Sequence, residues 1–173
     1  MRILDSIDAE YRRYKALGEG TLAQLGDEDL SREGPNGGNS IAVIVWHLSG
    51  NLTSRFTDFL TTDGEKPWRR RDEEFDVRAV TRDELLDKWN TGWRALFQAL
   101  ADLTDAHLDR RVTIRGQTLP VHDALHRSLA HTSYHVGQMV YLAKIFRGDE
   151  WKSLSIPRGA SEAYNQRLRD GRT

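Results

Sequence analysis

The sequence predicts an all-α protein built as a four-helix bundle. Four stretches carry apolar residues at three- and four-residue steps, which is the period of a helix that buries one face. Helix-end signals bound several of these stretches. Only Val112–Leu119 alternates apolar and polar residues as a strand does. The chain of 173 residues is long enough for a real core, and we expect one domain spanning residues 1–173.

The first two helices are predicted at Ile3–Leu25 and from Ile41 to about Leu60. The segment between them, Asp27–Asn39, is rich in glycine and contains a proline, so it is predicted to be a loop. Ser40 is a suitable N-cap, because its hydroxyl can accept a free backbone N–H of the second helix. The expected buried stripes are Leu4, Ile7, Tyr11, Tyr14 and Leu22 in the first helix and Ile41, Val45, Leu48, Leu52, Phe56 and Phe59 in the second.

A long connection, Thr61–Val80, separates the second helix from the third. A connection of this length permits a crossover, so the third helix need not be the antiparallel neighbour of the second. Thr81 and Glu84 have the spacing of a capping box that opens the third helix. The expected buried side of that helix is formed by Leu85, Trp89, Trp93, Leu96, Leu100 and Leu103.

The fourth helix follows a predicted small β-hairpin at Val112–Leu119, which would turn at Arg115 and Gly116. Pro120 suits the first turn of this helix. The helix is expected to end near Arg147, with Gly148 as its C-cap.

The tail after this helix, residues 149–173, contains Trp151, Leu154 and Ile156. These side chains are too apolar for a free tail, so we expect the tail to lie against the bundle.

Composition excludes several classes of function. A net charge of -1 predicts no bulk attraction to nucleic acid or to acidic membranes. The longest apolar run, Ile41–Trp46, is far shorter than the roughly 20 residues of a membrane helix. Acidic residues at Asp5, Asp8 and Glu10 stand where a signal peptide would be apolar. The chain has no Cys, which excludes disulfides and a thiolate nucleophile of its own, and we expect a cytoplasmic location.

Three histidines form a candidate metal site. His131 and His135 are four residues apart in the fourth helix, so they lie one turn apart on one face and can bind one metal ion. His47 lies beside the apolar stripe of the second helix, as the pair lies beside its own. If the two helices pack as neighbours, three imidazoles would leave a fourth position open, as in catalytic sites.

The alternative is that the histidines are ordinary polar residues of the bundle and bind no metal. His122 and His126 are also four residues apart, but they lie on the other flank of the fourth helix, near its start. We interpret them as surface or capping residues.

Two segments resemble a known family. Trp-His-Leu-Ser-Gly-Asn at 46–51 and Leu-Ala-His-Thr-Ser-Tyr-His-Val-Gly-Gln at 129–138 resemble the DinB/YfiT-like superfamily of metal-binding four-helix bundles. Residues 51–75 resemble a branch of that superfamily of unknown function, and the resemblance covers nearly the whole chain. It implies that His47, His131 and His135 hold one divalent metal ion, such as Zn or Ni.

The resemblance also implies a class of reaction. Characterised relatives are thiol-dependent S-transferases, a thiol-dependent isomerase and metal-dependent hydrolases. We therefore expect a metal-dependent enzyme that acts on a small-molecule substrate with a low-molecular-weight thiol. The alternatives are a hydrolase and a non-catalytic metal-binding stress protein. The superfamily name implies no DNA contact, and relatives favour a homodimer.

Residues around the site are less specific. Asn51 is one turn from His47, and Gln138 is three residues after His135, so each could accept or donate a hydrogen bond near a ligand imidazole. Ordinary hydrogen bonds within the bundle explain both residues equally well. The charged run Arg69–Glu74 is either a solvated loop or part of a segment in which Asp63, Glu65, Lys66 or an arginine closes over the open metal position and binds an anionic substrate. No catalytic residue is identified.

Overall fold

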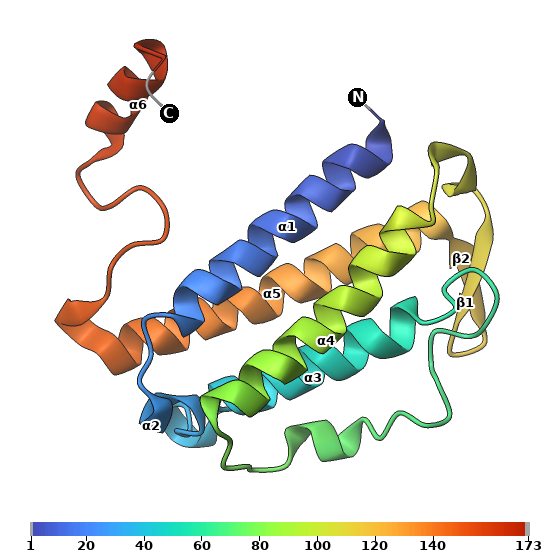
Figure 1. The fold of residues 1–173 in the computed structure, drawn as a ribbon, viewed down its shortest axis with the longest axis horizontal. Helices are drawn as coiled ribbons and strands as arrows, with labels where there is room; N and C mark the ends of the chain where they lie inside the picture. Colours follow the sequence, from blue (N-terminus) through green and yellow to red (C-terminus); the bar gives the residue numbers. More distant parts are fainter. Residues whose placement is uncertain (1, 172–173) are drawn as a thin grey trace.

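Six α-helices and one two-stranded sheet make up the described part of the chain, residues 2–171, in a computed structural model (Figure 1). The structure is mostly helical. The helices are α1 (Ile3–Leu22), α2 (Asp27–Leu30), α3 (Ile41–Phe56), α4 (Arg82–Ala101), α5 (Val121–Arg147) and α6 (Ser161–Arg169), and the strands are β1 (Arg111–Ile114) and β2 (Gln117–Pro120). Within residues 2–171, no helix is both long and apolar enough to cross a membrane.

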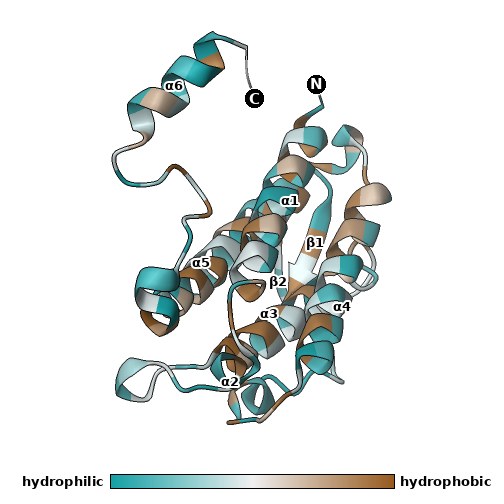
Figure 2. Ribbon diagram, turned by 60° about the vertical axis from the view of Figure 1, so that its left-hand side comes forward, coloured by the Kyte–Doolittle hydropathy of each residue, from teal (hydrophilic) through white to brown (hydrophobic). Residues whose placement is uncertain are grey.

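The four long helices pack around one core. Helix α3 contacts both α4 and α5, and α1 contacts α5 and α4. Hydrophilic and hydrophobic residues alternate along α1 and α4, as expected of helices that bury one face (Figure 2). The expected stripes of α3 and α4 are all buried, which confirms them, whereas Tyr14 of α1 is only half-buried.

The connection between α3 and α4 runs back along the molecule. Near its start, the Gly64 N–H donates to the Thr113 carbonyl in β1 at 2.8 Å. At its end, Arg82 Nε donates to Asp27 Oδ1 of α2 at 2.9 Å, and α2 precedes the start of α3. Helices α3 and α4 are therefore neighbours that point in the same direction (Figure 1).

Side-chain caps begin two of the long helices as predicted. The Val43 N–H donates to Ser40 Oγ at 3.2 Å. The Glu84 N–H donates to Thr81 Oγ1 at 3.3 Å, and the Thr81 N–H donates to Glu84 Oε2 at 2.8 Å, which completes the capping box.

Other predicted boundaries need correction. Helix α3 ends at Phe56 rather than Leu60, because Asp58 adopts a left-handed φ of 48° that a helix cannot accommodate. Helix α1 ends at Leu22 rather than Leu25. The segment 27–39 is not all loop, since it contains α2 and a 3₁₀ turn at Pro35–Gly37.

The predicted β-hairpin is present. Strands β1 and β2 are antiparallel, with Thr113 opposite Thr118. Arg115 and Gly116 at the turn have φ values of 55° and 72°, as a tight hairpin turn requires. Asp63 accepts hydrogen bonds from the N–H groups of both turn residues, each at 2.8 Å. The hairpin is thus tied to the connection between α3 and α4.

The tail lies against the long helices only over its first residues. Trp151 packs against the core, and the Lys152 N–H donates to Gln24 Oε1 at 2.8 Å. Residues 155–159 are exposed, and α6 has no buried residue and lies apart from the other helices (Figure 1). The expectation that the whole tail lies against the bundle is therefore wrong for α6.

Gly92→Ala should destabilise the protein, because α3 and α4 approach closely there. A Cβ at Gly92 would lie 2.7 Å from Ser49 Cα, which is a backbone atom, so the two helices would have to separate. We expect the free energy of unfolding to fall by about 1–3 kcal/mol, measured by urea denaturation.

The matched control is Gly137→Ala in the middle of α5, where a Cβ would meet no heavy atom within 4 Å. This substitution should stabilise the protein by about 1 kcal/mol, since alanine favours a helix over glycine. A Gly92→Ala protein as stable as the Gly137→Ala protein would contradict the close packing of α3 on α4.

Candidate metal centre

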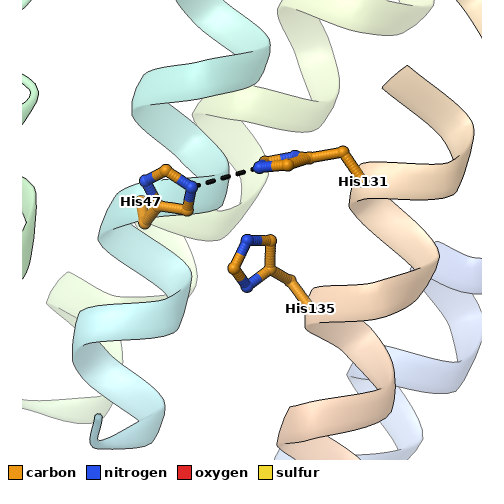
Figure 3. A group of neighbouring side chains, drawn as sticks. All are labelled: His47, His131 and His135. Atoms are coloured by element: carbon orange, nitrogen blue, oxygen red, sulfur yellow. Dashed lines mark hydrogen bonds between the residues drawn. The ribbon is translucent and has the colours of Figure 1, made fainter. Parts of the chain in front are cut away.

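The backbone of two neighbouring helices positions the three candidate ligands. His47 lies in the middle of α3, between the buried residues Val45 and Leu48. His131 and His135 lie one turn apart in α5, on the side that faces α3 (Figure 3). Side chains four residues apart on a helix project from the same face. The packing of α3 on α5 therefore brings the lone histidine to the pair.

The three imidazole rings converge on one point. His47 Nε2 and His131 Nε2 are 3.2 Å apart, and one ring nitrogen from each of the three histidines lies within 4.8 Å of the others (Figure 3). His47 is 5 % and His135 8 % exposed, while His131 is half-buried. The structure thus brings together the three histidines that the sequence analysis selected.

The spacing of these nitrogens fits a divalent cation. A tetrahedral ion with nitrogen ligands at about 2.0–2.1 Å holds two of them about 3.3 Å apart, close to the observed separation of the His47 and His131 nitrogens. His47 Nδ1 is 2.9 Å from a Glu74 carboxylate oxygen, so that nitrogen carries the proton and Nε2 presents a lone pair. His135 Nδ1 is likewise 2.9 Å from Gln138 Oε1. Two lone pairs directed at one point are the donor set that a metal requires.

The site favours neutral imidazoles. Burial, followed by the positive charge of protonated His135 and His47 and of Arg69 and Arg55, lowers the pKa of His131 to about 3. Burial, followed by the charge of His47, lowers the pKa of His135 to about 4, although the hydrogen bond to Gln138 opposes this shift. Neutral imidazole is the form that binds metal, so protons compete weakly for these two residues.

Glu74 supports the site, a role that was not predicted from the sequence. Its side chain accepts a bidentate hydrogen bond from Arg69, with Nε–Oε1 at 2.8 Å and Nη2–Oε2 at 2.9 Å, in addition to the bond from His47. Burial raises the pKa of Glu74, but the hydrogen bonds from Arg69 and His47 together lower this pKa by a larger amount. The pKa of Glu74 is therefore below its ordinary value, and the carboxylate stays ionised. Arg69 and Glu74, two residues of the charged run 69–74, therefore support the site and are not part of a solvated loop.

Gly50 makes room for this carboxylate. It lies one turn after His47 in α3, and a Cβ there would overlap Glu74 Oε1 and Cδ. Glycine is therefore needed at this position for Glu74 to reach His47. The glycine in the run 46–51 was a local signal for a close approach, but the sequence did not show which side chain approaches.

The two tentative supporting residues differ in their contacts. Gln138 hydrogen-bonds His135, as expected of a residue that orients a ligand imidazole. Asn51 lines the cavity beside His47, and within the described residues no hydrogen bond joins it to an imidazole.

The second histidine pair lies outside the cluster. His122 Nδ1 is 3.0 Å from the Leu108 carbonyl, so this residue ties the start of α5 to the preceding loop. His126 is exposed, and the ring centroids of the pair are 6.5 Å apart. Neither residue belongs to the group that could hold a metal.

A cavity of about 200 Å³ lies beside His47 and His131. Its remaining walls combine arginine side chains with the apolar side chains of Phe56, Phe59 and Ile114. A small molecule in this cavity would therefore lie next to the convergent nitrogens.

His131→Ala should abolish most metal binding, since two remaining imidazoles rarely retain an ion. The wild-type protein should purify with about one divalent ion per chain. His122→Ala is the matched control and should retain the metal, because its ring bonds a backbone carbonyl away from the site. Elemental analysis of the three purified proteins tests this, and equal metal content in both variants would contradict the assignment.

The metal-free protein should lose stability as the pH falls below about 6.5. His131 and His135 have pKa values lowered to about 3 and about 4, whereas an unfolded histidine titrates near 6.5. Between these values the unfolded chain binds more protons than the folded chain, so stability is present above about pH 6.5 and is lost progressively below it.

The pH dependence can be assigned with one variant. His131→Gln should show a shallower fall in melting temperature between pH 6.5 and 5 than the wild type, both treated with chelator. Parallel curves for the two proteins would mean that His131 is not held neutral by its surroundings.

Comparison with known protein families gives a match over most of the chain. A family described as a protein of unknown function, DUF1572, matches residues 1–160. No curated protein matches the chain. The match includes all three histidines, Glu74 and the four long helices, and it ends before α6. The chain therefore belongs to the DUF1572 family of proteins of unknown function.

Proposed function

We propose that this protein is a DinB/YfiT-like four-helix bundle that holds one divalent metal ion through His47, His131 and His135 and acts as a metal-dependent enzyme. The observation that carries the proposal is the convergence of three imidazole nitrogens, from two buried histidines and one half-buried histidine, beside a cavity. The resemblance at 46–51 and 129–138 supports the superfamily, and so does the arrangement of α1, α3, α4 and α5 around one core. Zn, Ni, Fe and Cu all suit a set of neutral imidazoles.

The residues around the ligands prepare the site for such an ion. Glu74 accepts the Nδ1–H of His47, which orients the ring and increases the basicity of Nε2. Gln138 orients His135 in the same way. A divalent ion bound there supplies a Lewis acid that lowers the pKa of a water or thiol that reaches its open side.

Thiol S-transfer is the reaction we favour. The chain has no Cys, so it contributes no thiol of its own, and a low-molecular-weight thiol would have to enter as a co-substrate. The thiolate is the nucleophilic form of a thiol, and a site that favours this form at neutral pH promotes its transfer to an electrophilic substrate. The cavity beside His47 and His131 leaves space for such a co-substrate.

Metal-dependent hydrolysis is the second candidate, and the arginine residues of the cavity favour it, since they suit an anionic ester. A non-catalytic metal-binding stress protein is the third. Measured turnover that follows metal occupancy would separate the two enzymes from the non-catalytic protein.

The expected homodimer also stays a proposal. Tyr134, Tyr141 and Ile145 are 60 %, 67 % and 41 % exposed and lie along one stripe of α5, which is the kind of surface a second copy could cover.

An uncharged thiol should stabilise the metal-loaded protein. We expect 2-mercaptoethanol to raise the melting temperature of the wild type by mass action, because it binds the folded metal-loaded form alone. Ethylene glycol, which replaces the thiol by a hydroxyl, is the matched control and should have a smaller effect. Neither compound should stabilise the His47→Ala protein, which lacks one ligand.

The same measurement can contradict the S-transfer proposal. If both compounds act equally, or if the thiol also stabilises His47→Ala, no thiol reaches the metal. Turnover of an anionic ester that follows metal occupancy would then favour the hydrolase.

A further inference from the structure

The cavity beside the three histidines is strongly basic. Five arginines line it, and no aspartate or glutamate is among its lining residues. They come from four segments of the fold: α3, the connection between α3 and α4, the hairpin turn and α5. These arginines are Arg55, Arg69, Arg71, Arg115 and Arg127.

One carboxylate behind the wall serves three of these arginines. Glu65 Oε2 accepts hydrogen bonds from Arg55 at 3.0 Å and from Arg115 at 2.9 Å, and it lies 3.9 Å from Arg69. Glu74 is shared between Arg69 and His47. The acidic groups thus hold the arginines in place without neutralising all of them.

One nitrogen of Arg69, a residue that lines the cavity, makes no hydrogen bond and lies 3.9 Å from Glu65 Oε2. Its side chain is only 2 % exposed, and its Nη1 is buried without a hydrogen-bond partner. A buried guanidinium N–H without an acceptor is costly, so such a group points to a missing acceptor. Because Arg69 lines the cavity, an oxyanion there could accept this hydrogen bond.

Two further arginines have a weak carboxylate partner or none among the described residues. Arg71 Nη1 lies 3.5 Å from Asp72, whose side chain is fully exposed, so solvent screens this pair. Arg127 makes no salt bridge with any carboxylate in residues 2–171. It lies one turn before His131 on α5, so it projects from the same face as that ligand.

The apolar part of the wall limits the size and shape of a ligand. Phe56, Phe59 and Ile114 line the cavity together with the arginines. A molecule with an oxyanion at one end and a small apolar body would satisfy both kinds of surface.

We propose that this cavity binds a small molecule through an oxyanion group, a phosphate or a carboxylate, which Arg69, Arg71 and Arg127 hold beside the three histidines. The anion site itself needs no metal. That the remainder of the ligand reacts at the histidines rests on the function proposed above.

Phenyl phosphate and benzoate are the probes, and phenol is their uncharged control. Each is titrated calorimetrically into the full-length protein, once with metal and once after treatment with chelator. We expect either charged probe to bind both forms and phenol to bind neither. The tighter of the two charged probes identifies the head group, and added salt should weaken binding.

Arg71→Gln and Arg127→Gln should each weaken the affinity of the charged probe by about tenfold, the loss expected for one charged hydrogen bond. Arg70→Gln is the matched control, because this exposed neighbour of Arg71 pairs with Glu73 and does not line the cavity. It should bind the probe as the wild type does. Circular dichroism of each variant checks that the fold is retained.

Three results would overturn the anion site. The first is that neither charged probe binds. The second is that Arg70→Gln loses as much affinity as Arg71→Gln and Arg127→Gln, and the third is that binding requires metal and is unchanged in Arg71→Gln and Arg127→Gln. Arginine-dependent binding by a protein that takes up no divalent metal even when metal is added would instead support the anion site and refute the proposed metal-dependent function. Metal binding without probe binding would refute the anion site and leave the proposed metal-dependent function supported.

Discussion

The buried carboxylate of Glu74 joins the long connection between α3 and α4 to the histidine cluster. An ionised carboxylate in the interior is stable only when charged or hydrogen-bonded partners surround it. Arg69 supplies two hydrogen bonds, and His47 supplies a third. Removing either partner would leave a buried charge incompletely compensated, so the connection must lie against α3 at this point.

Several features of the site follow from this interaction. The bond to Glu74 places the proton of His47 on Nδ1 and directs Nε2 toward His131. The bidentate bond places Arg69 in the wall of the cavity, and one of its nitrogens has no hydrogen-bond partner. Gly50 is required because a larger residue would occupy the space of the carboxylate. One carboxylate therefore affects both the candidate metal ligands and the proposed anion site.

A second group of acidic residues organises the other side of the cavity. Asp63 accepts the backbone N–H groups of the hairpin turn, and Glu65 bonds Arg55 and Arg115. Gly64 lies between these two acidic residues in the chain, and its N–H donates to the Thr113 carbonyl of β1. The hairpin and the start of the connection thus form one unit. The connection is long because it contacts the hairpin, supports His47 and returns to the start of α4.

The elements that depend on local chemistry could be predicted from the sequence. The buried stripes of α3 and α4, the caps at Ser40 and Thr81 and the hairpin turn at Arg115 and Gly116 each depend on residues within a few positions of one another. The choice of His131 and His135 over His122 and His126 rested on helical period and on the resemblance of residues 46–51 and 129–138 to a known superfamily, and the structure places only the first pair beside His47.

Tertiary structure decided everything that depends on residues far apart in the chain. Glu74 is 27 positions from His47, and Arg127 and Arg69 meet at one cavity only because α5 and the connection flank α3. A run of arginines and glutamates predicts a solvated loop as long as the partner of each charge is unknown. The tail shows the opposite case, since Trp151, Leu154 and Ile156 predicted its burial, but only Trp151 packs against the core, while Leu154 and Ile156 are exposed. Periodicity reports which face of an element is apolar, whereas burial and charge pairing depend on what the folded chain places against that face.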